Sequence, residues 1–455
     1  MRNSNEKRAT LGGRLSAVLV AAGSAVGLGN IWRFPTMAGD NGGGAFLVLY
    51  VLCVVVLGLP LMLAEFSVGR STRLNAVGAY RSLNPRWSFL GYNSVLAAAL
   101  ILGFYYVVSG WTLEYLVHSI TGDFARCSAP GEYRAVFDSF RVHPWRPVVY
   151  AWLFVMLTHA VIALGVQKGI ERSAKILMPL LLLVLVVLVG HSLMMPGGGD
   201  GVRFLLRPDF SKVTPHTLLA ALGQAFFSLS IGMGCMVTYA SYFNRETDLR
   251  RTAVQVAALD TLVALLAGLA IFPAAYSVGI FTADTTPSAG PELIFVTLPA
   301  IFDSMSWGMV WSAVFFFLLV VAALTSTISL HEVVTAYMHE EWHLGRRGAA
   351  ALTTVSMLFM SALASLSLGL LNGWRICGLT LFDGLDFLTA NILIPLGGLL
   401  TCLFVGWRFD RRRLHRELTN SGRLRCRILP LILFMLRWIC PFILLLIFLD
   451  NLGGL

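Results

Sequence analysis

The sequence contains few charged residues for its length. Aspartate, glutamate, lysine and arginine make up 13% of its 455 residues, whereas 57% are hydrophobic and the mean hydropathy is +0.75. Soluble domains carry about 25% charged residues, so this composition excludes a water-soluble globular protein. The sequence also lacks a low-complexity linker and a second soluble domain. It has instead a series of apolar runs of about 20 residues, the length that crosses a bilayer.

Eleven apolar runs predict an all-α polytopic membrane protein, because a backbone exposed to lipid must satisfy its hydrogen bonds within its own segment. The predicted spans are 15–37, 44–67, 89–119, 147–166, 171–195, 217–243, 250–280, 307–337, 349–371, 381–407 and 428–449. We expect an N-terminal segment 1–14, a five-span repeat 15–195, a loop 196–216, a second five-span repeat 217–409, a basic loop 410–427, span 11 at 428–449 and a tail 450–455.

Lysine and arginine gather on alternate connections between the predicted spans. Eight arginines lie between Arg408 and Arg427 alone, out of 34 basic residues in the chain. Because basic loops stay in the cytoplasm, the N-terminus is predicted to be cytoplasmic and the C-terminal tail to lie outside. This asymmetry explains the net charge of +10 without a nucleic-acid partner. Of the seven cysteines, only Cys127 and Cys377 fall together outside, and nothing in the sequence supports a disulfide between them.

Three spans carry residues that weaken a helix. The first is interrupted at Gly23–Asn30, the sixth reads F-F-S-L-S-I-G-M-G-C over 226–235, and the eighth reads A-A-L-T-S-T over 322–327. Spans 1 and 6 hold matching places in two five-span halves, and paired interruptions of this kind indicate a midplane transport site between inverted repeats. Close packing of helices through small residues is the alternative. A broken helix offers N–H groups to a carboxylate and carbonyls to Na⁺, so it suits an amino-acid zwitterion.

Several polar side chains lie within the spans. Hydroxyl and amide oxygens that could complete an ion site belong to Asn30, Ser228, Ser230, Thr325 and Ser326. A carboxylate within a span, such as Asp260, is costly and indicates function by default. Glu65 and Glu114 are interpreted as structural acids paired with backbone groups or an arginine.

Six short motifs now carry a family resemblance. They are G-S-A-V-G-L-G-N-I-W-R-F-P (23–35), N-G-G-G-A-F (41–46), G-L-P-L-M-L-A-E (58–65), G-Q-A-F-F-S-L-S (223–230), T-Y-A-S-Y (238–242) and A-L-T-S (323–326). Together they make the chain resemble the neurotransmitter:sodium symporters over nearly its whole length, and in particular a bacterial subset for hydrophobic amino acids. This family is itself a standard example of broken-helix architecture. The resemblance implies a sodium symporter in a bacterial cytoplasmic membrane, and no enzyme.

The resemblance implies two Na⁺ sites and a substrate site. The first ion would contact Asn30, Ser228, Asp260 and the carbonyl of Ala25. The second would contact carbonyls of Gly23, Val26 and Ala322 and the hydroxyls of Thr325 and Ser326. The implied substrate residues are Ala25, Gly27, Tyr105, Phe227, Ser228, Ser230, Met233, Ser326 and Leu330. Tyr105 would bind the substrate carboxylate, although its neighbour Tyr106 leaves a one-residue slip open, and Phe227 would form a lid.

The resemblance also implies moving parts. Arg33 and Asp386 would form the external gate, and Arg8 and Glu340, with Tyr242 nearby, the cytoplasmic gate. Gly169 and Pro179 match an element of span 5 that unwinds, and both residues weaken a helix, by roughly 1 and 3 kcal/mol relative to alanine.

Two departures from well-known members matter. The chain has eleven spans where many have twelve, so its oligomeric state stays open. Asp260 replaces an asparagine, and a fixed carboxylate could substitute for chloride, so we expect chloride-independent transport. The apolar pocket wall predicts a bulky, neutral L-amino acid, aromatic or branched.

Two alternatives remain at this point. His339, Glu340 and His343 form a literal H-E-x-x-H, the pattern of zinc proteases, although no third ligand stands out in the sequence. A proton-coupled carrier of the same broken-helix architecture is the other alternative, and an absence of Na⁺ dependence would favour it.

Overall fold

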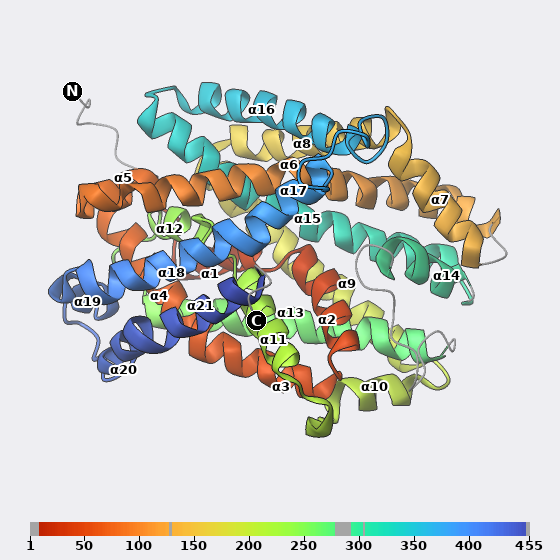
Figure 1. Cartoon of the computed structure of the whole chain (residues 1–455), viewed down its shortest axis with the longest axis horizontal. Coiled ribbons are helices and arrows are strands. Elements are labelled where there is room, and N and C mark those ends of the chain that lie inside the picture. Colours follow the sequence, from red (N-terminus) through yellow and green to blue (C-terminus); the bar gives the residue numbers. More distant parts are fainter. Residues whose placement is uncertain (1–8, 127–129, 278–292, 304, 452–455) are drawn as a thin grey trace.

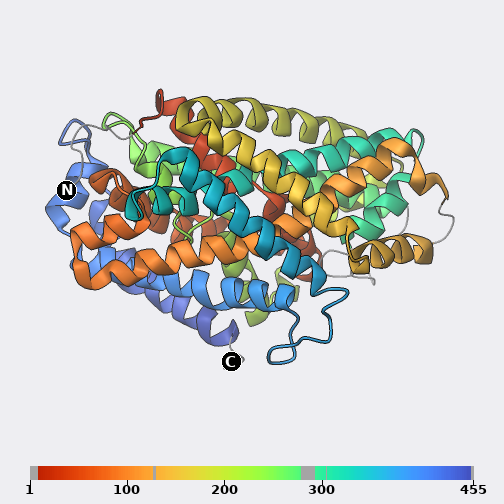
Figure 2. The same cartoon turned by 90° about the horizontal axis from the view of Figure 1, so that it is seen from above.

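A computed structural model of the chain describes residues 9–126, 130–277, 293–303 and 305–451. Within these ranges helices dominate, and the only β-type pairings are two isolated bridges, Gly43 with Pro208 and Ile376 with Leu379. The long helices lie side by side along the long axis of the molecule in both views (Figures 1 and 2). The all-α prediction is confirmed.

The first five predicted spans are helical from end to end, apart from one break. Their elements are α1 (Arg14–Ala25), η1 (Gly29–Arg33) and α2 (Phe34–Asp40); α3 (Gly44–Cys53), η2 (Val54–Gly58) and α4 (Leu59–Thr72); α6 (Ser88–Thr121); α8 (Arg146–Ala163); and η5 (Val166–Glu171) with α9 (Arg172–Leu193). The elements η1, η2 and η5 are π-helical turns, which the sequence reading did not anticipate. Such turns are frequent at functional sites.

The remaining six predicted spans follow the same pattern. They comprise α11 (Pro215–Ser228) and α12 (Cys235–Ala240); α13 (Leu249–Ser277); α15 (Gly308–Glu341); α16 (Arg346–Leu366); α17 (Leu381–Phe387), η8 (Leu388–Leu393), α18 (Ile394–Leu403) and η9 (Phe404–Arg408); and α20 (Leu429–Phe434), η10 (Met435–Ile439) and α21 (Cys440–Asn451). In the described ranges, nine helical segments are long and apolar enough to cross a membrane singly, and a bent pair in span 1 makes a tenth. Span 6 is divided between α11 and α12.

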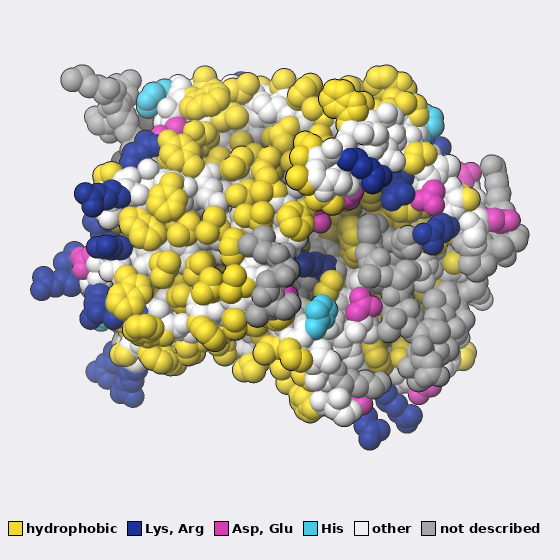
Figure 3. All heavy atoms as spheres, in the orientation of Figure 1, with side chains coloured by type: hydrophobic (Ala, Val, Ile, Leu, Met, Phe, Trp, Pro, Cys, Tyr) yellow, Lys and Arg dark blue, Asp and Glu magenta, His cyan; other side chains and the backbone are white. Residues whose placement is uncertain are grey.

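Shorter helices occupy the connections. They are α5 (Ala76–Leu83), η3 (Pro85–Trp87), η4 (Asp123–Arg126), α7 (Pro130–Val142), α10 (Gly198–Leu206), η6 (Phe210–Lys212), η7 (Leu293–Thr297), α14 (Leu298–Asp303) and α19 (Arg411–Leu418). Helices α7, α10 and α14 lie at one end of the molecule and α19 at the other (Figure 1). Figure 3 shows Lys and Arg gathered at the α19 end, beside a broad band of hydrophobic side chains. Cys127, the possible disulfide partner of Cys377, lies outside the described residues.

Spans 1 and 6 are broken where the sequence predicts. In span 1 the two helical parts, Arg14–Ala25 and Gly29–Asp40, meet at 56°. In span 6, α11 ends at Ser228 and α12 begins at Cys235. The residue before α12, Gly234, has φ of +80°, a conformation that glycine adopts without steric cost.

The expected interruption of span 8 is wrong. Helix α15 runs unbroken from Gly308 to Glu341. Its hydroxyls are satisfied inside the helix, because Thr325 donates to the carbonyl of Ala322 at 2.9 Å and Thr327 to that of Leu324 at 3.1 Å. Hydroxyls that bond back to the preceding turn let a helix continue through a polar stretch.

Candidate functional site

Asn30 lies at the break of span 1 and is fully buried. Its amide nitrogen Nδ2 donates to Ser228 Oγ at 3.1 Å and to Asp260 Oδ1 at 2.7 Å. Its Oδ1 accepts a hydrogen bond from the N–H of Gly27 at 3.1 Å, which ties the side chain to the unwound backbone. Three ligands predicted for the first Na⁺ therefore lie together, contributed by spans 1, 6 and 7.

Asp260 is surrounded by neutral donors. Besides Asn30, it accepts from Ser228 Oγ at 2.6 Å and from the hydroxyl of Tyr50 at 2.9 Å, both at Oδ2. Its exposed fraction is 0%. No lysine or arginine of the described residues forms an ion pair with it. A buried carboxylate without a cationic partner is costly, so this cluster has the charge and the oxygen donors for a bound cation.

The ligands predicted for the second Na⁺ gather between α1 and α15. Thr325 Oγ1 lies 3.2 Å from the carbonyl oxygen of Val26 and 2.9 Å from that of Ala322. A side chain at Gly23 would lie 3.8 Å from Thr325 Cβ, so Gly23 faces the same place. Ser326 follows Thr325 in the helix and points toward Gly27 instead. Hydroxyl and carbonyl oxygens of this kind are hard ligands suited to Na⁺.

A cavity with an empty volume of about 410 Å³ lies beside these clusters. All nine predicted substrate residues line it: Ala25, Gly27, Tyr105, Phe227, Ser228, Ser230, Met233, Ser326 and Leu330. The sequence reading omitted three further lining residues, Ser24, Gly29 and Ile101. The wall combines apolar side chains with hydroxyls, and none of the described residues that line it is charged.

Tyr105, and not Tyr106, faces this cavity. Its hydroxyl accepts a hydrogen bond from the N–H of Leu28 at 3.3 Å and bonds to Ser326. The space beside it depends on a glycine, because a Cβ at Gly27 would lie 2.1 Å from Ser326 Oγ and 3.3 Å from the Tyr105 hydroxyl. The Tyr105 hydroxyl thus lies beside the break of span 1, where it borders the cavity.

Hydrogen bonds hold the unwound segment of span 6 in position. Ser230 Oγ donates to the carbonyl of Ser24 at 2.8 Å, across to the broken span 1. Glu65 Oε1 accepts from the N–H of Gly232 at 2.7 Å. Glu65 is therefore a structural acid that binds backbone groups, as predicted. Gln224, which the sequence reading missed, donates to the carbonyl of Gly29 at 3.2 Å.

The predicted external gate residues flank the outer side of the cavity. Arg33 lies over the Phe227 ring, with its Cζ 4.6 Å from the ring centroid. Its charge acts on Asp386, but the two side chains do not come within the 4.0 Å of an ion pair, and Asp386 is exposed. The two charges interact without direct contact.

The predicted cytoplasmic gate is only partly visible. Arg8 lies outside the described residues, and Glu340 accepts from the backbone N–H of Asn75 at 2.9 Å. Tyr242 donates to a different acid, Glu332, at 2.6 Å. Glu332 is fully buried and pairs with Arg346 through both carboxylate oxygens. Glu332 was not predicted from the sequence, because its partners Tyr242 and Arg346 lie on other elements.

Comparisons with known proteins agree with this geometry. The profile of the Sodium:neurotransmitter symporter family matches residues 8–142 and 146–454. The chain is 38% identical over 452 residues to the sodium-dependent transporter YhdH of Bacillus subtilis (strain 168), with 99% of both chains covered. It is 35% identical over 467 residues to a sodium-dependent transporter of Haemophilus influenzae, with 99% of this chain and 100% of the relative covered. The chain belongs to the Sodium:neurotransmitter symporter family.

A solved structure supports the same fold. MhsT in complex with L-phenylalanine matches with a TM-score of 0.87 and 42% identity, over 98% of this chain and 100% of that chain. This member of the symporter family is therefore an integral membrane transporter and not an enzyme.

The zinc-protease alternative fails for a local reason as well. Helix α15 ends at Glu341, and His343 has a left-handed backbone with φ of +54°. The two histidines thus do not share a helix face, and His339 Nδ1 lies 2.6 Å from the carbonyl of Leu344. Among the described residues, no group of three or more His, Cys, Asp or Glu could hold a metal ion.

Span 5 of this symporter begins with a π-helical turn. Gly169 lies in η5 and Pro179 inside α9. Between them Glu171, which the sequence reading did not single out, accepts from the N–H of Gly12 at 3.0 Å and from Ser16 Oγ at 2.7 Å. The start of span 5 is thereby fastened to the start of span 1.

Proposed function

We propose that this transporter is a Na⁺-coupled symporter that imports a bulky hydrophobic L-amino acid by alternating access. The observation that carries the proposal is the buried Asp260 cluster directly beside an uncharged cavity, since Ser228 belongs to both. A cation at Asp260 would neutralise the carboxylate and would also attract the carboxylate of a substrate. Ion and substrate would then each stabilise the binding of the other, which is the requirement for coupling.

Two Na⁺ ions are assigned to this mechanism. The first binds Asn30, Ser228, Asp260 and the carbonyl of Ala25, and the second binds the carbonyls of Gly23, Val26 and Ala322 with the hydroxyls of Thr325 and Ser326. The Thr325 hydroxyl oxygen lies 3.2 Å from the carbonyl oxygen of Val26 and 2.9 Å from that of Ala322. The three oxygens are therefore close enough together to share one ion.

The substrate class follows from the cavity wall. Phe227, Met233, Leu330 and Ile101 give an apolar surface. The hydroxyl of Tyr105 accepts from the N–H of Leu28 and can donate its own proton to a carboxylate. Among the described residues, no charged side chain lines the cavity, so a charged substrate side chain would find no oppositely charged partner there. MhsT, whose structure holds L-phenylalanine, supports an aromatic or branched amino acid here.

Chloride independence is part of the proposal. The fixed carboxylate of Asp260 supplies a negative charge next to the first ion site. An anion bound from solution would add a second negative charge at the same buried place, which is electrostatically unfavourable.

The driving force is sufficient. A charge that moves down 100 mV yields about 2.3 kcal/mol, and a tenfold Na⁺ gradient adds about 1.4 kcal/mol. Two ions therefore supply roughly 7 kcal/mol per cycle, enough to concentrate a zwitterion steeply. The proposal includes a bacterial cytoplasmic membrane as the location. The N-terminus would lie in the cytoplasm and the C-terminus outside, as the basic connections predict.

The test is uptake into proteoliposomes. Twenty amino acids compete against Na⁺-dependent tryptophan uptake, and aromatic and branched ones should compete best. Replacement of chloride by gluconate at constant Na⁺ should leave uptake unchanged, and a collapse would contradict the role given to Asp260. Uptake that follows a proton gradient and ignores Na⁺ would favour the proton-coupled alternative.

A further inference from the structure

Arg437 occupies an unusual position for an arginine. It lies in η10, inside the last apolar span, eight residues after that span begins at Leu429. Its Nε donates to the carbonyl of Gly406 at 2.6 Å, and its Cζ lies 5.3 Å from the Trp407 ring centroid. No carboxylate in the described ranges forms an ion pair with it. A charge within a span is costly and pairs with another charge or with backbone carbonyls. Arg437 has a carbonyl and a ring as partners, so its positive charge is solvated but not neutralised by the described residues.

A groove opens directly beside this arginine. It has an empty volume of about 660 Å³, and its polar lining consists of Arg437 and Arg411. Its other walls are apolar and include Pro430, Leu433, Phe434 and Trp438. The groove thus combines two cationic forks with an apolar floor and has no acidic side chain in its lining. Its chemistry matches a ligand with an anionic head and a hydrocarbon body.

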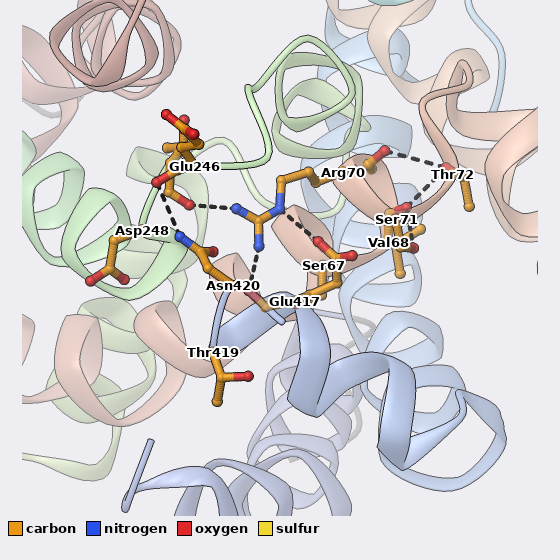
Figure 4. Close-up of polar contacts among 12 residues, drawn as sticks. Ser67, Val68, Arg70, Ser71, Thr72, Glu246, Asp248, Glu417, Thr419 and Asn420 are labelled. Atoms are coloured by element: carbon orange, nitrogen blue, oxygen red, sulfur yellow. Dashed lines mark hydrogen bonds and ion pairs between the residues drawn. The ribbon is translucent and has the colours of Figure 1, made fainter. Parts of the chain in front are cut away.

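Arg411 is held in place by the packing of its helix. The buried face of α19 carries Leu414 and Leu418. On the same helix, Glu417 pairs with the buried Arg70 of α4 at 2.6 Å, and Arg70 also donates to the carbonyls of Thr247 and Glu417 (Figure 4). This anchoring fixes α19 to the transporter. Arg411, at the other end of α19, is exposed and lines the groove.

Exposed aromatic side chains surround the groove. Trp407 and Trp438 are 52% and 59% exposed, and their rings lie 5.3 Å apart; exposed tryptophans gather where the bilayer meets water. Phe434 and Phe442 continue along the same span with 52% and 63% exposure. Acyl chains could lie along them. Basic pockets next to spans are typical sites for anionic lipid head groups.

We propose that this groove binds an anionic phospholipid. The phosphate-bearing head group would sit between the guanidinium groups of Arg411 and Arg437, and an acyl chain would pass over Phe434 toward Phe442. The lipid supplies the counter-charge that Arg437 lacks. The groove shares no lining residue with the transport cavity. The test of lipid binding is therefore independent of the test of the proposed substrate.

The test measures lipid binding to the purified full chain by native mass spectrometry. Delipidated protein is titrated with phosphatidylglycerol, with phosphatidylcholine, and with soluble glycerol 3-phosphate. Arg411→Gln/Arg437→Gln should weaken phosphatidylglycerol binding by about thirtyfold, since each basic residue near an anionic surface contributes roughly fivefold. Arg413→Gln, on the same helix but outside the groove, is the matched control and should leave binding unchanged.

Several results would overturn the proposal. Equal binding of phosphatidylcholine would remove the anionic selectivity, and equal binding of glycerol 3-phosphate would show a plain phosphate site. An equal loss in Arg413→Gln would show only a general attraction to the basic face. If the native chain formed a dimer and the double variant a monomer, with unchanged lipid binding, the groove would be a contact between subunits and not a lipid site. Should the double variant fail to fold, Arg411→Gln alone, which changes an exposed residue, must still weaken binding about fivefold.

Discussion

Asp260 determines the electrostatics of the transport site. It is completely buried, and its three side-chain donors, Asn30, Tyr50 and Ser228, are all neutral. Neutral hydrogen bonds lower the cost of burying a carboxylate but do not remove its charge. The cluster therefore has the charge and the oxygen atoms that the proposed cation site needs. The proposed ion site thus depends on the Asp260 carboxylate and on the oxygen atoms next to it.

Replacement of Asp260 by asparagine tests this account of the acid. The variant keeps the shape of the side chain and loses its charge, and bonds to charged oxygens are roughly twice as strong as neutral ones. We expect the Na⁺ affinity to fall by about tenfold or more, measured from the Na⁺ dependence of uptake. Asp200→Asn, at an exposed carboxylate of α10, should behave as the native chain. An unchanged Na⁺ dependence in Asp260→Asn would contradict the assignment.

Gly27 tests the size of the cavity. Alanine there would place a Cβ 2.1 Å from Ser326 Oγ, and overpacking of this kind costs about 1–3 kcal/mol. Substrate binding should weaken by about tenfold in a binding assay with labelled tryptophan. Gly223→Ala is the control, because a Cβ at Gly223 meets nothing within 4 Å. Equal affinities in the two variants would show that Gly27 does not border the bound substrate.

Helix breaks act at the scale of whole elements. The segment between α11 and α12 lacks the hydrogen bonds of a regular helix. Glu65 on α4 accepts from the N–H of Gly232 in this segment, and Ser230 in the segment donates to the carbonyl of Ser24 in span 1. A break is stable only where such partners exist. The broken spans are thus built by residues on both sides of the gap, including residues far away in the sequence.

Removal of Glu65 should release the break in span 6. Glu65→Ala leaves the N–H of Gly232 without its acceptor, and an unsatisfied buried donor costs about 1–3 kcal/mol. We expect a lower thermal midpoint and weaker substrate binding, whereas Glu65→Gln, which keeps an acceptor oxygen, should lie between this variant and the native chain. If alanine and glutamine behaved alike, the bond to Gly232 would not be what fixes the segment.

Much of this architecture could be predicted from the sequence, for physical reasons. The length of each apolar run predicts where a membrane-spanning helix begins and ends. The predicted span 89–119, for example, lies within two residues of both ends of α6, Ser88–Thr121. Glycines and Asn30 marked the break of span 1. The error at span 8 arose because Thr325 and Ser326 resemble a break in sequence, although Thr325 bonds to its own helix. Tyr50 and Glu332 were missed because their roles depend on neighbours that only the fold brings near.

The whole molecule differs at its two ends. At the end near residue 11, the N–H of Leu11 donates to the carbonyl of Tyr242 at 2.9 Å, and Glu171 fastens Gly12. At the other side of the cavity, Arg33 and Asp386 form no direct ion pair. The two ends thus differ in that direct hydrogen bonds join the elements at the first, whereas Arg33 and Asp386 make no direct contact at the second. Under the proposed alternating access, we expect this difference to reverse during the cycle.

The pair of Glu332 and Arg346 tests the closed end. Arg346→Ala leaves a fully buried carboxylate without its cation, which should cost about 3–5 kcal/mol and lower the thermal midpoint. A cysteine placed in the cavity should then react faster with a thiol reagent added from the cytoplasmic side. Glu332→Gln/Arg346→Ala removes both charges and should recover most of the stability. A double variant as unstable as the single one would show that charge pairing is not the cause.

Sodium-driven uptake by Asn30→Ala in proteoliposomes tests the central claim most directly. Asn30 joins the broken span 1 to Ser228 and Asp260, so its loss should dismantle the first ion site. The account predicts that an inward Na⁺ gradient drives tryptophan uptake in the native chain and in the exposed-site control Asn372→Ala. In Asn30→Ala, uptake should fall to the level measured with K⁺ in place of Na⁺. Full Na⁺-dependent uptake by Asn30→Ala would contradict the account.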